Sequence, residues 1–310
     1  MPLHDFPEPP AGPLPDGVVR VWWAGTDDAD ERLCGLLDPV ERARHRETAA
    51  PADRRRFLLG CAITRVALGG YLGLPPEEVP LVRRCPVCGG PHGKVRLGPV
   101  TPPPGDHHAP GRPAPAPGEL PAARPAAPCP DTGAPAPDAH AVAPAPGGHE
   151  GAPVPAVPRF SVTHSGGLVG VAFHRGGEVG LDAEAVDPGL DVSAIAPGVL
   201  TAGELAELDR LPADGRLRGF LRYWCRKEAA VKAVGTGLRT RFRDLGVTPP
   251  GAPPAVTAWP GRPGTARALH LTDLDVAGSH LACLAVLGRA PAAIVHHRAG
   301  PALRRWAATR

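Results

Sequence analysis

The sequence contains very little lysine. Its 34 basic residues include three lysines, Lys94, Lys227 and Lys232, and all the others are arginines. The accompanying excess of Ala, Pro and Gly is typical of GC-biased coding, which favours Arg wherever only positive charge is needed. A lysine that persists is therefore a candidate for chemistry that needs a compact ammonium group with an adjustable pKa.

Long apolar runs are also absent. No stretch has the length of apolar sequence needed to span a membrane. The opening residues, MPLHDFPEPP, lack the basic start and apolar run of a secretory signal. The seven cysteines are odd in number and scattered, which is typical of reduced thiols rather than of a disulfide framework. A net charge of +3 does not indicate a nucleic-acid binder. We therefore expect a cytoplasmic protein.

Residues 99–158 have no aromatic side chains and are dominated by Pro, Ala and Gly. Such a segment cannot bury enough apolar surface to offset the entropy lost on ordering, so we expect a disordered linker. This insert divides the chain into an N-terminal half (1–98), a C-terminal half (159–288) and a basic tail (289–310).

Hydrophobic patterning outside the insert predicts a mixture of strands and helices. A Gly-Gly hairpin signal, a capping box at 201–204 and a Gly after a long apolar face mark several boundaries. Short antiparallel connections favour the α+β class. The predicted strands are 18–24, 159–165, 168–174, 179–186, 266–276 and 280–288, and the predicted longer helices are 51–69 and 217–234.

Two carboxylates occur close together in the stretch EVGLDAEAVDP (178–188). Side chains alternate along a strand, so Asp182 and Glu184 share one face while Leu181 and Ala183 take the other. Two like charges at that separation repel each other, and burial would remove their hydration, so the arrangement is unfavourable unless a cation balances the charge. Either this face is exposed to water or something positive binds there.

The helix predicted over 217–234 carries a second charged pair. Glu228 and Lys232 are four residues apart and share a face, whereas Lys227 points elsewhere. An exposed salt bridge would explain the pair if it stood alone. If this helix packs on the strand of Asp182 and Glu184, three carboxylates and one lysine converge. Such a site suits Mg²⁺ and phosphoryl transfer.

Arginines cluster in ERARHRE (41–47) and DRRRF (53–57). Each arginine by itself is consistent with a solvated helix face, but so many on adjacent turns also favour an anion site. The two interpretations remain open.

The segment CPVCGGPHGK (85–94) contains three residues of the types that bind zinc. Cys85, Cys88 and His92 resemble half of a zinc knuckle, but structural zinc usually has four protein ligands. A tight turn that presents Lys94 is the alternative.

Several of these motifs together resemble the 4′-phosphopantetheinyl transferases, specifically the larger, Sfp-type class. GLDAE (180–184) and WCRKEAAVKAVGTGL (224–238) are similar to the two signature motifs of that family. FSVTHSGGLVGVAF (160–173) resembles its Ser/Thr-His-Ser-Gly motif, and DRRRFLLG (53–60) and HGK (92–94) follow the expected order. The likeness covers the chain except the insert and the tail.

The resemblance implies a fold of two similar α/β halves related by a pseudo-twofold, with coenzyme A bound in the cleft between them. It implies Mg²⁺-dependent transfer of 4′-phosphopantetheine from coenzyme A to a serine of an apo acyl, peptidyl or aryl carrier protein. The second product would be 3′,5′-ADP. Two linked halves would make a monomer sufficient.

The resemblance also implies roles for four residues at the centre of the site. Asp182, Glu184 and Glu228 would hold Mg²⁺ against the pyrophosphate of coenzyme A. Lys232 would contact the phosphate under attack, and Glu228 is the candidate base for the carrier serine.

Five further residues would bind the nucleotide end of coenzyme A. The resemblance assigns Thr163 and His164 to the phosphates, and Lys94, Arg44 and Arg56 to a clamp. Val95 follows Lys94 where the family usually has Pro, which affects the shape of that loop.

Three other functions are consistent with the same residues. The chain could hydrolyse a nucleoside pyrophosphate similar to coenzyme A with Mg²⁺. It could bind coenzyme A without catalysis, although that function predicts the loss of a metal carboxylate or lysine. It could be a zinc-dependent interaction protein built on Cys85, Cys88 and His92.

Overall fold

The computed structural model describes residues 2–83, 90, 94–100, 157–237, 240–276 and 278–310. The chain forms two compact units, one of residues 1–79 and 156–310 and one of residues 80–155. In the second unit, β2 (Leu81–Val82) pairs with β3 (Arg96–Leu97) in antiparallel fashion. Most of the predicted insert, and the possible zinc ligands Cys85, Cys88 and His92, lie outside the described residues.

The first unit contains a four-stranded sheet in the order β11-β1-β5-β4. Its strands are β1 (Val18–Gly25), β4 (Arg159–Ser165), β5 (Leu168–His174) and β11 (Ala293–Arg298). The pairs β1–β5 and β5–β4 are antiparallel, and β11 adds to β1 in parallel. The long helix α2 (Pro51–Leu72) packs on β4 and β5.

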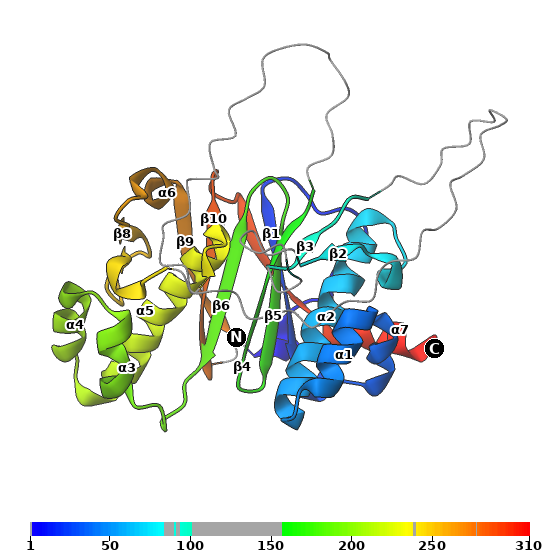
Figure 1. Ribbon diagram of the computed structural model, residues 1–310, viewed down its shortest axis with the longest axis horizontal. Helices are drawn as coiled ribbons and strands as arrows, with labels where there is room; N and C mark the ends of the chain where they lie inside the picture. Colours follow the sequence, from blue (N-terminus) through cyan, green and yellow to red (C-terminus); the bar gives the residue numbers. More distant parts are fainter. Residues whose placement is uncertain (1, 84–89, 91–93, 101–156, 238–239, 277) are drawn as a thin grey trace, which may run out of the picture. The chain divides into compact units, whose positions relative to one another are not determined.

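A second sheet of the same unit has the order β6-β10-β9. Its strands are β6 (Val179–Ala185), β9 (Leu269–Val276) and β10 (His280–Leu287), and both pairs are antiparallel. The helix α5 (Ala213–Val234) packs on β6 and β10 (Figure 1). Both sheets therefore repeat one plan, in which a strand, a long helix and a hairpin follow in sequence and the last strand pairs with the first.

A shared core joins the two sheets of this unit. Val19, Val21 and Trp23 of β1 lie in one buried cluster with Leu181 of β6 and Leu284 of β10. The opposite face of the second sheet packs on α5 in a separate cluster. The order of layers is helix, sheet, sheet, helix, which buries both faces of β5, β6 and β10.

The remaining elements complete the outer layers. They are α1 (Pro39–Glu47), α3 (Val192–Val199), α4 (Ala202–Asp209), α6 (Pro263–Ala268), α7 (Gly300–Ala308), β7 (Gly246–Val247), β8 (Val256–Ala258) and the short 3₁₀ helices η1 (Leu3–Asp5), η2 (Thr26–Asp28), η3 (Glu31–Leu36), η4 (Pro76–Glu78) and η6 (Phe242–Asp244). The capping box predicted at Thr201 and Glu204 is present at the start of α4.

Each strand and helix predicted from the pattern is present; β4 and β5 have the predicted bounds, and the other elements have at least one shifted end. The predicted end of α2 at Gly69 is wrong, since the helix continues to Leu72 and its left-handed cap is Gly73, with φ of 68°. Residues up to Ala268 form α6, so β9 begins three residues later than predicted. The basic tail contributes β11 and α7.

Strand pairing groups the chain differently from the predicted boundary between halves. The segment 159–174 was assigned to the C-terminal half, yet β5 hydrogen bonds to β1 along its length. The reason is burial, because β1 and β5 place apolar side chains on the same face, such as Val21 and Ala172. The mixed α and β composition agrees with the expected class. Among the described residues, no helix has the length and apolarity needed to cross a membrane.

Candidate active site

The acidic face of β6 lies directly against α5 because Gly180 has no side chain. A Cβ at this position would be 2.0 Å from the carbonyl oxygen of Ala229 and 2.5 Å from the nitrogen of Ala233. Asp182 lies on the same strand face and contacts α5, while Leu181 and Ala183 are in the core shared by the two sheets. The predicted separation of the acidic and apolar faces is confirmed.

Lys232 of α5 reaches back to the acidic strand. Its Nζ lies 2.7 Å from Oδ1 of Asp182 and 3.1 Å from the carbonyl oxygen of Leu181. The Asp182 side chain is almost fully buried, and its Oδ2 has no hydrogen-bond partner among the described residues. A buried carboxylate oxygen without a partner is costly, so this atom is suited to a cation.

Glu184 is held by two other side chains. Its Oε2 accepts a 2.6 Å hydrogen bond from the hydroxyl of Ser165, and its Oε1 accepts a 3.2 Å bond from the indole N–H of Trp224. Burial raises the pKa of Glu184, and the charge of Asp182 raises it further. Neither Ser165 nor Trp224 was identified as a site residue from the sequence.

Electrostatics link these groups to Glu228. Burial raises the pKa of Glu228, Lys232 opposes that shift, and Asp182 and Glu184 reinforce it. Burial would lower the pKa of Lys232, but Asp182, Glu228 and Glu184 together raise it. The charges of the three carboxylates and the lysine therefore act on one another, while their convergence on one ion stays a prediction. In the described part of the chain, the oxygens of these three carboxylates are not all within 4.8 Å of one another.

A row of hydroxyl groups connects the two sheets at this site. Ser161, Thr163 and Ser165 occupy alternate positions of β4 and project from one face, and each accepts a backbone N–H from β6 at 3.0–3.1 Å. The donors are Leu181, Ala183 and Ala185. These bonds replace the usual backbone ladder between neighbouring strands. The Ser-x-Thr-x-Ser alternation was the available sequence signal for them.

Two of these hydroxyls also orient the acidic pair. Ser165 donates to Glu184, and Thr163 lies 3.4 Å from Oδ1 of Asp182. Thr163 is buried, so its hydroxyl faces the protein interior. Phosphate binding by Thr163 stays a prediction, and the position of its hydroxyl does not favour it.

Positive side chains lie at the end of β4. Burial lowers the pKa of His164, and the charges of Arg56 and Lys232 lower it further. Arg56 donates a 2.7 Å hydrogen bond to the carbonyl oxygen of Gly166 and pairs with Asp53. The burial of His164 is partial, since the residue keeps a solvent-exposed surface. The charges of Arg56 and Lys232 thus both act at His164, where they would attract an anion.

Two other residues predicted to bind the nucleotide, Arg44 and Lys94, lie outside β4, β6 and α5. Arg44 is exposed on α1, with its guanidinium 5.3 Å from the centre of the Phe57 ring. Lys94 belongs to the second unit, two residues before β3. Their predicted contacts with the nucleotide stay predictions.

Lys227 points away from the site, as predicted, and is fully buried. Its Nζ lies 2.6 Å from Oε2 of Glu204 and donates to the carbonyl oxygens of Val199 and Phe242 at 2.8 and 2.9 Å. Three acceptors around one ammonium explain why this position is a lysine, since a planar guanidinium has a different donor geometry.

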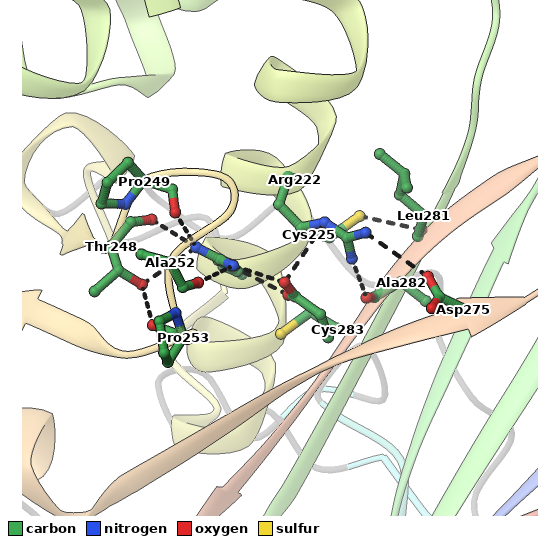
Figure 2. A network of polar contacts seen from close by, with 12 residues as sticks. Arg222, Cys225, Thr248, Pro249, Ala252, Pro253, Asp275, Leu281, Ala282 and Cys283 are labelled. Carbon is green, nitrogen blue, oxygen red and sulfur yellow. Dashed lines mark hydrogen bonds and ion pairs between the residues drawn. The ribbon is translucent and has the colours of Figure 1, made fainter. Parts of the chain in front are cut away.

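Arg226, which precedes Lys227 on α5, binds this helix to β9 and to the loop after β7. It makes a two-point ion pair with Asp273 at 2.6 and 3.1 Å and donates to three carbonyl oxygens. These acceptors are on Thr248, Pro249 and Ala252, which Figure 2 shows on one loop beside the helix. Figure 2 also shows Arg222 of α5 directed at the carbonyl oxygen of Ala282 on β10. The helix that carries Glu228 and Lys232 is therefore held on several sides.

A buried aspartate against a lysine, with two partly buried glutamates and an arginine nearby, is an arrangement of charge suited to a site that acts on phosphate groups. Comparison with known proteins agrees with this interpretation. The profile of the ACPS family, described as the 4′-phosphopantetheinyl transferase superfamily, matches residues 178–284. This region includes β6, α5 and all four central residues of the site. Residues 178–284, about a third of the chain, are therefore similar to the 4′-phosphopantetheinyl transferase superfamily.

Individual relatives agree over different lengths. The 4′-phosphopantetheinyl transferase HetI of Nostoc sp. is 26% identical over 287 residues, which cover 91% of this chain and 93% of HetI. The 4′-phosphopantetheinyl transferase AcpT of Escherichia coli K12 is 40% identical over 76 residues, which cover 24% of this chain and 39% of AcpT. The crystal structure of Thermotoga maritima holo-[acyl-carrier-protein] synthase superposes with a TM-score of 0.31 and 21% identity, over 36% of this chain and 63% of that one.

Proposed function

We propose that this protein transfers 4′-phosphopantetheine from coenzyme A to a serine of an apo carrier protein, as a member of the Sfp-type class. The single observation that supports this most is the contact of Lys232 with Asp182 where α5 packs on β6, with the charges of Glu228 and Glu184 acting on the same lysine. In the reaction, the serine oxygen forms a bond to the phosphorus that carries pantetheine. The bond from that phosphorus to the bridging oxygen breaks, and 3′,5′-ADP leaves with the electron pair.

The acidic residues fit a divalent cation. Three carboxylates are the ligand type that Mg²⁺ prefers, and the buried Oδ2 of Asp182 has no protein partner among the described residues. We assign Asp182, Glu184 and Glu228 as the residues that would hold the ion. When bound, Mg²⁺ would neutralise charge on the pyrophosphate.

The protein's own side chains supply the other roles. Lys232 stabilises negative charge that develops on the phosphate, since its raised pKa keeps it protonated. Glu228 is the candidate base that accepts the serine proton. His164 and Arg56 attract the phosphates at the nucleotide end.

The repeated plan of the two sheets supports the pseudo-twofold part of the proposal. In both repeats, a first strand precedes a helix of 22 residues that ends at a glycine with positive φ. A hairpin follows, and its second strand pairs with the first strand. We therefore propose halves of 18–174 and 179–287, with the Pro-rich insert inside the first half.

Mass spectrometry of an apo carrier protein tests the function. With Mg²⁺ and coenzyme A, the carrier gains about 340 Da, the mass of one phosphopantetheine arm, by transfer to one serine. A hydrolase would release phosphopantetheine and leave the carrier mass unchanged. A module that only binds coenzyme A would leave the carrier mass unchanged and would release no phosphopantetheine.

Substitution of Glu228 tests the assigned chemistry. Glu228→Gln keeps the size of the side chain but removes its charge, and Lys232→Ala removes the ammonium. Each lowers the initial rate of carrier modification by about 100-fold or more. Glu207→Gln, an exposed glutamate on α4, is the matched control and retains the wild-type rate. Equal rates for Glu228→Gln and wild type would remove Glu228 from the mechanism.

The proposal also includes the carrier protein that is modified and the oligomeric state of the enzyme. Acyl, peptidyl and aryl carrier domains present a similar serine, and an assay against a panel of apo carriers separates them. We propose a cytoplasmic monomer.

A further inference from the structure

A second cluster of metal-binding side chains occurs outside the acidic site. Glu31 and Cys34 lie on η3, and His45 lies on α1. The Cys34 sulfur is 3.5 Å from Oε2 of Glu31 and 4.0 Å from Nδ1 of His45. All three ligand atoms lie within 4.8 Å of one another, and no other group of described residues meets that criterion.

Local structure explains why these three residues meet. Residues three apart in a 3₁₀ helix are eclipsed, so Glu31 and Cys34 project from the same side of η3. His45 is in the last turn of α1 and is 8% exposed, with its ring packed beside Phe57. Glu31 is exposed and Cys34 is partly exposed, which leaves the cluster open to solvent on one side.

Hydrogen bonding alone does not satisfy the cluster. The thiol of Cys34 has one proton but two acceptors beside it, the Glu31 carboxylate and Nδ1 of His45 when that nitrogen carries the lone pair. A cation would bind all three lone pairs at once.

We propose that Glu31, Cys34 and His45 form a Zn²⁺ site with an open fourth position. A tetrahedral Zn²⁺ with bonds of about 2.3 Å to sulfur and about 2.0 Å to oxygen or nitrogen keeps its ligand atoms about 3.5 Å apart. The two measured separations are near this value. Thiolate and imidazole ligands favour Zn²⁺ over Mg²⁺, so the site is chemically distinct from the all-carboxylate site. The bound ion would join η3 to α1.

Cobalt(II) is the probe, because a Co²⁺–thiolate bond gives a charge-transfer absorption band that oxygen ligands do not give. The experiment uses the full-length chain in which Cys85, Cys88 and Cys129 are replaced by Ser, which removes the other thiols that could bind metal near the CxxC segment. We expect one equivalent of Co²⁺ to give the thiolate band and Zn²⁺ to abolish it. Absence of the band in this protein would overturn the proposal.

Two pairs of variants locate the site. Cys34→Ser removes the band, while Cys61→Ser, which changes a partly exposed cysteine on α2, retains it. Glu31→Gln weakens Co²⁺ binding by about tenfold, while Glu47→Gln, another exposed glutamate, does not change it. A band that survives Cys34→Ser, or equal affinities for the two glutamine variants, would contradict the assignment. These readouts use metal alone and do not depend on the proposed transfer activity.

Discussion

At the scale of single residues, two serines of β4 differ in whether they contact a carboxylate of the acidic site. Ser161 and Ser165 each accept one backbone N–H from β6, at 3.0 and 3.1 Å. Only Ser165 also donates to a carboxylate of the site, that of Glu184. This difference makes the two serines a matched pair for experiment.

We expect Ser165→Ala to raise the Mg²⁺ concentration for half-maximal activity by about 10- to 100-fold, because the Glu184 carboxylate loses the donor that orients it. Ser161→Ala leaves that concentration unchanged. Ser161→Ala lowers the free energy of unfolding by about 1–3 kcal/mol, because it leaves the buried N–H of Leu181 without an acceptor. Ser165→Ala lowers it less, because the N–H of Ala185 is only partly buried. Metal-dependent rates and urea denaturation measure the two effects. Ser165→Thr restores metal activation, and an equal shift for both alanine variants would show that Ser165 has no special role.

At the scale of elements, α5 is held in place by buried charges. Lys227 and Glu204 form an ion pair in which neither side chain is appreciably exposed, and Glu204 also caps α4. Burial lowers the pKa of Lys227, and the nearby Glu204 opposes this shift. Removing one partner of such a pair lowers the stability of the fold strongly, because the other partner is then left as an isolated buried charge.

Lys227→Met is expected to lower the free energy of unfolding by about 3–5 kcal/mol, because the Glu204 carboxylate loses its partner inside the core. In a double-mutant cycle with Glu204→Gln, the double variant loses less stability than the sum of the two single variants. Urea denaturation measures all four proteins. Additive losses would show that the two side chains act independently.

The last strand of the first sheet carries a pH-sensitive contact. The indole N–H of Trp23 donates to Nδ1 of His296 at 2.9 Å, so this nitrogen must be unprotonated. The His296 ring stacks between Phe6 and Trp23. Burial lowers the pKa of His296 below its ordinary value of 6.5.

A lowered pKa in the folded state means that the unfolded chain takes up the proton first as pH falls. The contribution of His296 to stability is complete above the ordinary histidine pKa of about 6.5 and is lost as pH falls through the folded-state value. The protection of β11 amides against hydrogen exchange, relative to the intrinsic rate at each pH, should therefore decrease between pH 7 and 5 as His296 takes up its proton. His296→Asn keeps an acceptor for Trp23 without a titrating group, so the pH dependence of exchange should decrease. An unchanged pH profile in this variant would assign the effect to another group.

At the scale of the whole molecule, the insert is separable from the chemistry. The acidic site lies entirely within the unit formed by residues 1–79 and 156–310. The free energy of closing a loop grows only with the logarithm of its length, so a shorter connection is not penalised.

We expect removal of residues 101–155 to leave the rate of carrier modification and the thermal midpoint close to those of the full chain. Mass spectrometry and thermal unfolding measure the two quantities. A deletion protein that folds normally but does not modify the carrier would show that the segment contributes to substrate binding.

The amino-acid sequence by itself determined which side chains could form the acidic site and which faces they occupy. Alternation along β6 and the spacing of Glu228 and Lys232 follow from local backbone geometry, which is the same wherever those elements lie. The boundaries of helices were less predictable, because the cap of α2 depends on which glycine adopts positive φ.

Tertiary structure alone decided which distant segments meet. It paired β5 with β1 and brought Ser165 and Trp224 to Glu184, because burial of apolar faces, rather than order along the chain, selects strand neighbours. It also placed Lys232 on Asp182, through the contact that Gly180 permits between α5 and β6. Those contacts join residues about 50 positions apart, and no local pattern encodes a distance of that kind.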